Sequence, residues 1–342
     1  EIGSGLVGSE MCIRDRPDSY YNAIINWVKQ RYDLIVTKEV INFVPGIVPG
    51  IGMAMNCFTQ KGDKVMIQPP VYHPFAWVTT RNERTLVINP LKWENGMYRM
   101  DLDAFREQIK GCKLFILCNP HNPGGVVWTE AELRAIADIC YDEKVLVFSD
   151  EIHADLTLPP HTHRPFATVS EKARMNSVTF MSPSKAFNMP GLSASHALIF
   201  NEDLRKRFRI YMDAGELDMG HVFAFLSVEA AYSHGTEWLD QCLAYIQGNI
   251  DFVDEFLKKH APKIKAIRPE ASYLVWLDCR ELELSQKDLN EFFVDKAHLA
   301  LNDGEMFGKE GIGFMRLNVA SPRCIIEKAM KQLADAYQLY IK

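Results

Sequence analysis

Short apolar runs separated by polar, periodic segments dominate the middle of this chain. The runs that read as β-strands lie at residues 64–68, 85–89, 113–119, 145–150, 177–181 and 196–200. Most are continuously apolar rather than alternating, which is typical of parallel strands buried on both faces. Between two of them, a helix is predicted over 129–143, with Thr129 as its N-cap and its apolar spacing set by Leu133, Ile136 and Ala137. This alternation predicts an α/β fold in which a mostly parallel sheet carries helices on both faces.

The pattern changes after a long helix expected over residues 236–260. The elements expected beyond it are a strand at "YLVWLD", a helix from Ser285, a strand at "FMRLNVA" and a helix from about Pro322. A mixed tail of this kind predicts a second, smaller α+β domain. We therefore expect a large domain at residues 17–262 and a small C-terminal domain at residues 263–342.

Composition and charge narrow the classes of partner. The chain has 342 residues, of which 47% are apolar and 24% charged, as in an ordinary globular protein. Its net charge is -6 and its Lys and Arg residues are scattered, so we expect no nucleic acid partner. No apolar run approaches the roughly 18 residues that span a bilayer, so we expect no membrane partner.

Cysteine and histidine usage points away from disulfides and metals. The eight cysteines form no CxxC pair and mostly lie in apolar runs, which favours a reducing compartment and a cytoplasmic location. His161 and His163 are two residues apart in a Pro-flanked segment with no third ligand nearby. We therefore expect no metal site.

Polar residues follow three of the predicted strands directly. "CNPHNPGG" contains Asn122, "SDEIHADL" contains Asp150 and "SPSKAFN" contains Lys185. Taken singly, these could be a turn residue, a helix cap and a solvated lysine. Because the carboxyl ends of parallel strands meet at one sheet edge, the three side chains together would place an amide, a carboxylate and an amine at one site.

A pyridoxal phosphate cofactor would account for this set. It needs a lysine for its Schiff base, a carboxylate beside its ring nitrogen, donors for its phenolic oxygen and an anion site for its phosphate. An ionised Asp beside the ring nitrogen keeps that nitrogen protonated, and the ring then accepts electrons from a substrate carbanion.

Three motifs carry a resemblance to a known family. In order, "NPHNPGG", "SDEIHADL" and "SPSKAFNMPGL" resemble the aminotransferase class I/II family of fold-type I pyridoxal phosphate enzymes. Within it, "PDSYYNAIINW", "PVYHPF" and "DEIHADL" are most similar to the cystathionine beta-lyase subgroup of C-S lyases, the MalY/PatB type. The resemblance runs from about Pro17 to the C-terminus.

The resemblance implies a role for each motif residue. Lys185 matches the Schiff-base lysine, Asp150 the partner of the ring nitrogen, and Asn122 the donor to the phenolic oxygen. His153 stands where many aminotransferases have a tyrosine that also reaches this oxygen. Tyr72 in "PVYHPF" matches the aromatic residue stacked on the cofactor ring, or else serves only core packing.

The phosphate and the substrate carboxylate need sites of their own. Residues 44–58 read as a glycine turn that runs into a helix, whose first N–H groups attract an anion. The expected backbone donors are Gly46, Ile47 and Val48, and the expected hydroxyl donors are Ser182 and Ser184. Ser193 occupies a position where many aminotransferases have a phosphate-binding arginine. Arg316 matches the arginine that binds the substrate carboxylate, with Arg323 as the competing candidate.

The implied reaction is β-elimination from a sulfur amino acid, L-cystathionine or a related cysteine S-conjugate, to a thiol, pyruvate and ammonia. Transamination is the alternative, because it uses the same residues as far as the carbanion. A third reading is a non-catalytic binding or regulatory protein that retains the fold. The family also implies an isologous homodimer.

The first sixteen residues, "EIGSGLVGSEMCIRDR", match nothing in the family and read as a non-native segment resembling translated sequencing adapter. The alternatives are a divergent natural N-terminus or an unusual signal peptide, although no basic start precedes a sufficient apolar core. Relatives carry an upstream glycine-tyrosine motif whose tyrosine reaches the neighbouring subunit's cofactor. If this chain lacks that motif, we expect weak cofactor binding and poor turnover, both restored by grafting a relative's segment in place of residues 1–16.

Overall fold

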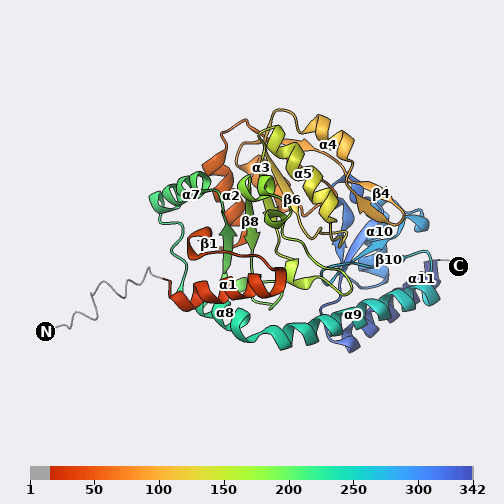
Figure 1. Ribbon diagram of the computed structural model, residues 1–342. Coiled ribbons are helices and arrows are strands. Elements are labelled where there is room, and N and C mark those ends of the chain that lie inside the picture. The colour runs from red at the N-terminus through yellow and green to blue at the C-terminus, as the bar shows by residue number, and fades with distance from the viewer. Residues whose placement is uncertain (1–15, 341–342) are drawn as a thin grey trace.

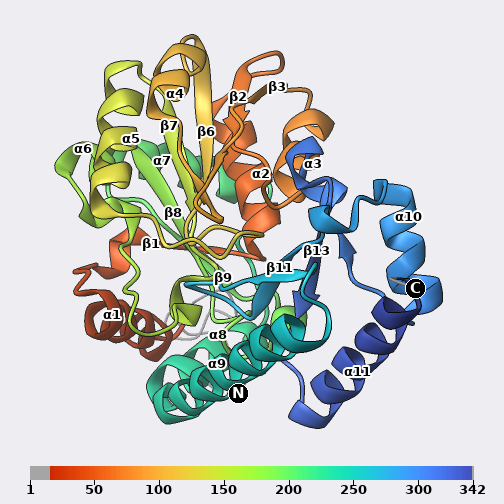
Figure 2. The same ribbon diagram turned by 90° about the vertical axis from the view of Figure 1, so that its right-hand side faces the viewer.

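The six strands predicted from the apolar runs all form, and they share one seven-stranded sheet. The computed structural model describes residues 16–340. In spatial order the strands are β1 (Ile41–Val44), β9 (Ser195–Leu198), β8 (Ser177–Met181), β7 (Leu146–Asp150), β6 (Cys112–Cys118), β2 (Lys64–Ile67) and β3 (Thr85–Ile88). The predicted α/β fold class, with helices on both faces of a mostly parallel sheet, is confirmed (Figure 2).

One strand runs against the others. The pairs from β3 to β8 are parallel, whereas β9 is antiparallel to both β8 and β1. A parallel pair needs a crossover of about a dozen residues, usually a helix. The segment between β8 and β9 contains only turns and the 3-10 turn Pro190–Leu192, so the chain simply reverses. As a result, β1, β6, β7 and β8 all end at the same edge of the sheet.

Side-chain alternation along the strands fills both faces. In β6, Phe115 and Leu117 pack in the cluster with α4 (Leu102–Gln108) and α5 (Glu130–Asp142). Their neighbours Leu114 and Ile116 pack in the opposite cluster. That cluster includes α2 (Ile47–Phe58), α3 (Pro74–Arg81) and α7 (Glu202–Ala214). The short helix α6 (Glu171–Met175) adjoins α5. Continuous apolar runs are therefore what this sheet requires.

Four further helices form the base of the molecule. They are α1 (Asp18–Tyr32), α8 (Val222–His234), α9 (Thr236–His260) and α11 (Arg323–Tyr340). Helix α1 lies along α8, and the long helix α9 runs beneath both sheets beside α11 (Figure 1). One apolar cluster continues from Ile24 in α1 through Ile250 in α9 to Leu333 in α11.

A second, antiparallel sheet lies towards the C-terminus. Its order is β10 (Lys265–Ile267), β11 (Leu274–Asp278), β13 (Phe314–Asn318) and β12 (Asn302–Asp303), and α10 (Gln286–Glu291) adjoins it. A separate hairpin, β4 (Lys92–Glu94) and β5 (Met97–Arg99), packs against it through Trp93 and Phe314, whose ring centroids are 5.4 Å apart. The smaller α+β unit is present, while the boundary at residue 262 stays a prediction.

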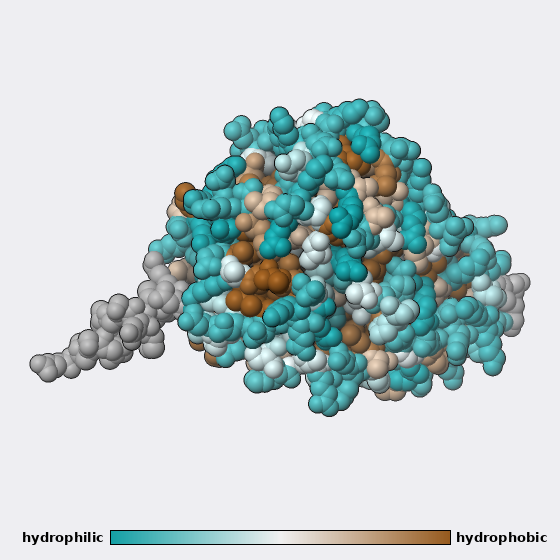
Figure 3. Space-filling model, in the orientation of Figure 1, coloured by the Kyte–Doolittle hydropathy of each residue, from teal (hydrophilic) through white to brown (hydrophobic). Residues whose placement is uncertain are grey.

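The surface and the N-terminus add two observations. Hydrophilic side chains cover most of the face in Figure 3, with apolar ones in small patches. Within residues 16–340, none of the helices has the length and apolar character needed to cross a bilayer. The predicted non-native segment falls almost wholly on residues 1–15, which lie outside the described residues.

A buried histidine in the sheet makes stability sensitive to acid. His196 on β9 is fully buried, neither ring nitrogen has a hydrogen-bond partner, and burial lowers its pKa to about 3. Between about pH 6.5 and 3, His196 binds a proton in the unfolded chain but stays neutral in the folded chain. The free energy of unfolding therefore falls as the pH is lowered through this range.

The free energy of unfolding of the wild type should fall between pH 7 and pH 5. We expect this fall to be about 2 kcal/mol smaller in His196→Gln. Urea titrations at the two pH values measure this loss, and the difference within each variant cancels any constant cost of the substitution. The exposed His234→Gln is the control. An unchanged loss in His196→Gln would show that His196 is protonated in the folded chain.

Candidate active site

A cavity of about 560 Å³ lies at the sheet edge where β1, β6, β7 and β8 end. It gathers residues from both sheets and from the start of α2. Of the residues expected from sequence, those in its wall are Gly46, Ile47, Val48, Tyr72, Asn122, Asp150, His153, Ser184, Lys185 and Arg316. Segments up to 270 residues apart in the chain therefore meet at one site, which is large enough for a small-molecule ligand.

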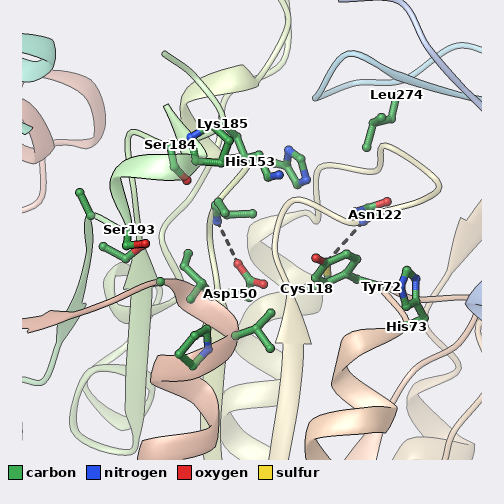
Figure 4. Close-up of a pocket in the computed structure, with 18 of the residues that line it drawn as sticks. Tyr72, His73, Cys118, Asn122, Asp150, His153, Ser184, Lys185, Ser193 and Leu274 are labelled. Carbon is green, nitrogen blue, oxygen red and sulfur yellow. Dashed lines mark hydrogen bonds between the residues drawn. The ribbon is translucent and has the colours of Figure 1, made fainter. Parts of the chain in front are cut away.

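Lys185 lies in the turn that follows β8. The turn is closed by backbone hydrogen bonds from Phe187 N to Pro183 O and from Met189 N to Ser184 O, both 2.9 Å. Ser184 and Ala186 on either side are buried, and Lys185 is half-buried in the cavity wall (Figure 4). Within residues 16–340 its amine has no ion-pair partner, so it is free to react with a ligand.

Asp150 ends β7 and is only 4% exposed. Its register partners on the neighbouring strands are Cys118 and Phe180. Oδ1 accepts a 3.1 Å hydrogen bond from the backbone N–H of Ile152. Burial raises its pKa to about 7; the charge of Glu151 adds to this rise, while the Ile152 hydrogen bond and Lys185 oppose it. A buried carboxyl of this kind is ready to pair with a cation.

Three more side chains surround the cavity. Asn122 Oδ1 accepts a 2.9 Å hydrogen bond from Arg316, which leaves its amide N–H groups to donate to a ligand. The Nδ1 atom of His153 is buried without a partner, and burial, Lys185 and Arg316 lower the pKa of its ring to about 3. His153 is therefore neutral at ordinary pH. The ring of Tyr72 packs edge-to-face on Phe75 at 5.8 Å.

The N-terminus of α2 forms one end of the cavity. Gly46 precedes the helix with φ of 129°, a conformation that side-chain-bearing residues rarely adopt. The N–H groups of Ile47 and Val48 lie in the first turn, where no helical acceptor exists, so they can bind an anion. Ser193 and Ser184 also line the cavity. Ser182 does not, because its hydroxyl donates to Ala194 O at 2.7 Å.

Arg316 on β13 is held by amides rather than carboxylates. It donates to Asn122 at 2.9 Å and to Asn302 at 2.8 Å, and it stacks on Phe307 at 4.7 Å. Burial lowers the pKa of its guanidinium to about 10, and no carboxylate pairs with it in the part of the chain that is described. Its charge is thus available to an anionic ligand. Arg323 lies outside this wall and bonds Asn249 at 2.8 Å.

Sequence reasoning missed several residues of the wall. Tyr273 directly precedes β11 and Asn318 ends β13, and both of these strands belong to the second sheet. Asn318 is two residues after Arg316 and therefore shares its face of the strand, a signal that was available in the sequence. His73 follows Tyr72 and also lines the cavity. Nothing in the sequence alone places Tyr273 near Lys185.

The donor set fits a phosphorylated pyridine aldehyde. It offers an unpaired amine, a buried carboxyl with a raised pKa, neutral donors and an open helix N-terminus around one cavity. The orphaned Nδ1 of His153 and the unpaired Arg316 are costly to bury without a ligand, which argues that this wall is built to bind one.

Comparison with known proteins agrees with this reading. The chain matches Aminotransferase class I and II over residues 15–333. It belongs to this family. The resemblance and the fold-type I architecture predicted from the motifs are therefore confirmed.

Individual relatives cover most of the chain. Cystathionine beta-lyase PatB of Bacillus subtilis (strain 168) is 38% identical over 317 residues, which are 92% of this chain and 82% of the relative. Cystalysin of Treponema denticola, solved with a pyridoxal 5'-phosphate cofactor, has a TM-score of 0.94 and 32% identity over 99% of this chain and 86% of its own. A pyridoxal phosphate-bound candidate aminotransferase of Clostridium difficile 630 has a TM-score of 0.92 and 40% identity, covering 94% and 84%.

Proposed function

We propose that this family member is a pyridoxal phosphate-dependent C-S lyase. It cleaves L-cystathionine or a related cysteine S-conjugate by β-elimination to a thiol, pyruvate and ammonia. The observation that carries the proposal is the 38% identity to a cystathionine beta-lyase over 92% of this chain. The polar wall of the cavity supports it, because Lys185, Asp150 and Arg316 line one cavity.

We infer the residues that hold the cofactor from the cavity wall. Lys185 would bond its aldehyde, Asp150 would lie at its ring nitrogen, and Asn122 and His153 at its phenolic oxygen. Tyr72 would stack on the ring. The start of α2 at Gly46, Ile47 and Val48, with the hydroxyls of Ser184 and Ser193, would bind the phosphate. When bound, the cofactor supplies a carbonyl that condenses with the substrate amine and a ring that accepts electrons.

The remaining steps fall to the protein's own groups. Arg316 binds the substrate carboxylate with two N–H groups and so orients the α-carbon over the cavity floor. Lys185 then removes the α-proton as general base. Asp150 stays ionised against a protonated ring nitrogen. The leaving group is a thiolate on the β-carbon, and hydrolysis of the remaining three-carbon unit releases pyruvate and ammonia.

The experiment that tests this proposal is a pyruvate assay on purified protein loaded with pyridoxal phosphate. L-Cystathionine, L-cysteine and cystathionine with an added 2-oxo acid are supplied separately. We expect pyruvate without the 2-oxo acid. Transamination would instead release no pyruvate from L-cystathionine and would convert the added 2-oxo acid into its amino acid, an alternative that rests on the name of the Clostridium difficile relative. A purified protein that stays colourless and takes up no cofactor, even with a relative's segment in place of residues 1–16, would favour the non-catalytic role.

We also propose a homodimer in the cytoplasm. At the start of α8, a surface of Val222, Phe223 and Leu226 is 59%, 67% and 50% exposed, and an apolar surface of this kind suits a second copy. The mass measured by light scattering checks the dimer. The seven cysteines in residues 16–340 are all free, in keeping with a reducing compartment.

A further inference from the structure

The buried pair of Glu151 and His163 lies next to the cavity without being part of its wall. His163 belongs to the "HTH" segment, at which the sequence analysis expected no metal site, and it bonds Glu151. Glu151 is 1% and His163 3% exposed, and Nε2 of the ring lies 2.8 Å from Glu151 Oε2. In the described part of the chain, no three potential metal ligands cluster together. The pair therefore needs another explanation.

The hydrogen bonds define the charge of the pair. Oε1 of Glu151 accepts from the hydroxyl of Ser149 at 2.7 Å and from the backbone N–H of Phe166 at 2.8 Å. Nδ1 of His163 has no partner, which matches a neutral ring whose only N–H, at Nε2, donates to Glu151. With three donors around its two oxygens, Glu151 is a carboxylate. The pair therefore carries one buried negative charge.

This charge lies beside Asp150 in the chain. Because successive side chains at a strand end point to opposite sides, Asp150 faces the cavity and Glu151 faces the interior. Backbone bonds hold the junction, since Glu151 N donates to Phe180 O at 2.9 Å. A cation placed against Asp150 would thus feel two carboxylates, one in contact and one at longer range through a medium of low dielectric constant.

We propose that Glu151, held as a carboxylate by His163, is a positioning residue that strengthens the hold of Asp150 on a protonated ring nitrogen. This inference rests on the proposed function, because it concerns the same cofactor. The raised pKa of Asp150, to which the charge of Glu151 contributes after burial, agrees with it. Substituting Glu151 should therefore alter the protonation of a ligand that it does not touch.

Other charged groups near the pair are few and can be named. On α1, the ring of Tyr32 lies edge-on to His163 at 5.4 Å, and its hydroxyl donates a hydrogen bond to Asp155. Asp155 also accepts from Trp27 at 2.9 Å and is influenced by Arg31. On the cavity side, Lys185 faces Asp150. None of these groups lies within hydrogen-bond distance of Glu151 in the described residues. Its charge raises the pKa of Asp150, while His163 acts on Asp155.

Glu151→Gln tests the charge alone. The amide oxygen can keep both Oε1 hydrogen bonds, and its NH₂ can donate to His163 once that ring takes the other tautomer. The probe is pyridoxine 5'-phosphate, which lacks the aldehyde and so cannot bond Lys185, and whose near-ultraviolet spectrum changes when its ring nitrogen deprotonates. At saturating probe, we expect this deprotonation in Glu151→Gln about one pH unit below that in the wild type.

Two further variants separate charge from packing. Glu151→Asp keeps the charge but is too short for all three hydrogen bonds. We therefore expect a lower melting temperature, while the pH at which the bound probe deprotonates stays near that of the wild type. Ser149→Ala removes one hydrogen-bond donor and keeps the charge, so the pH midpoint of probe deprotonation should not fall in this variant. A wild-type midpoint in Glu151→Gln, or equal shifts in all three variants, would overturn the inference. Wild-type protein that binds neither the probe nor pyridoxal phosphate would overturn the proposed function instead.

Discussion

Lys185→Ala is expected to abolish pyruvate release and the yellow absorption of the cofactor-loaded protein, while the chain stays folded. No other amine lines this cavity wall in the described residues, and no other group there can bond an aldehyde and then remove the α-proton. Turnover should fall by at least about 10⁴-fold, since both the covalent attachment and the general base are lost. Absorption spectra and the pyruvate assay measure the two effects.

The fold should not depend on this lysine. Its side chain is half-buried and makes no ion pair in the described residues, so the melting temperature should match that of the wild type. Lys287→Ala, at an 83% exposed position on α10, is the matched control for loss of a lysine and should keep full activity. Normal turnover in Lys185→Ala would exclude covalent chemistry at this residue.

Asp150→Asn is expected to bind the cofactor and yet lose about 100-fold or more in turnover. Asn has the same shape and can still accept the hydrogen bond from Ile152 N–H, but it carries no charge to hold a proton on the ring nitrogen. The loss should fall on kcat more than on KM, because Asp150 does not bind the substrate. Steady-state kinetics with L-cystathionine separate the two constants.

The cofactor-free protein offers an independent reading of the same variant. The pKa of Asp150 is raised to about 7, above its value in the unfolded chain, so its contribution to stability is lost as pH rises through 7. Asp150→Asn has no carboxyl that must ionise in this buried place, so it lacks this loss of stability at high pH. We expect its melting temperature at pH 8 to equal or exceed that of wild-type protein without cofactor. Wild-type kinetics in this variant would remove Asp150 from the mechanism.

The sheet could be predicted because its strands are buried on both faces and so have continuous apolar sequences. β1 did not stand out because Asn42 interrupts its apolar run and the strand leads directly into the glycine turn. The reversal at β9 follows from the lack of a helix between residues 182 and 194, which strand patterns do not report. Helix α8 was missed because its own apolar residues lie on all of its faces, so its sequence has no helical periodicity to detect.

The residues of the candidate site likewise divide into those that the sequence could predict and those that it could not. Asn122, Asp150 and Lys185 could be found from position alone, since each directly follows a strand of one sheet. Arg316 needed the family resemblance, because its strand belongs to another sheet and its approach depends on tertiary packing. The pairing of His163 with Glu151 could not be foreseen, since the two residues are twelve positions apart and their contact depends on tertiary packing.

The two amide bonds of Arg316 have a consequence for how this enzyme could diversify. Asn122 lies in the segment that follows β6 of the large sheet, and Asn302 lies on β12 of the small sheet, so the two hydrogen bonds of the guanidinium depend on how the two sheets are placed relative to each other. A substitution in the small sheet that shifts β13 would change the preferred size of amino acid while leaving Lys185 and Asp150 in place. Selection could thus retune which substrates are accepted through residues that never meet them.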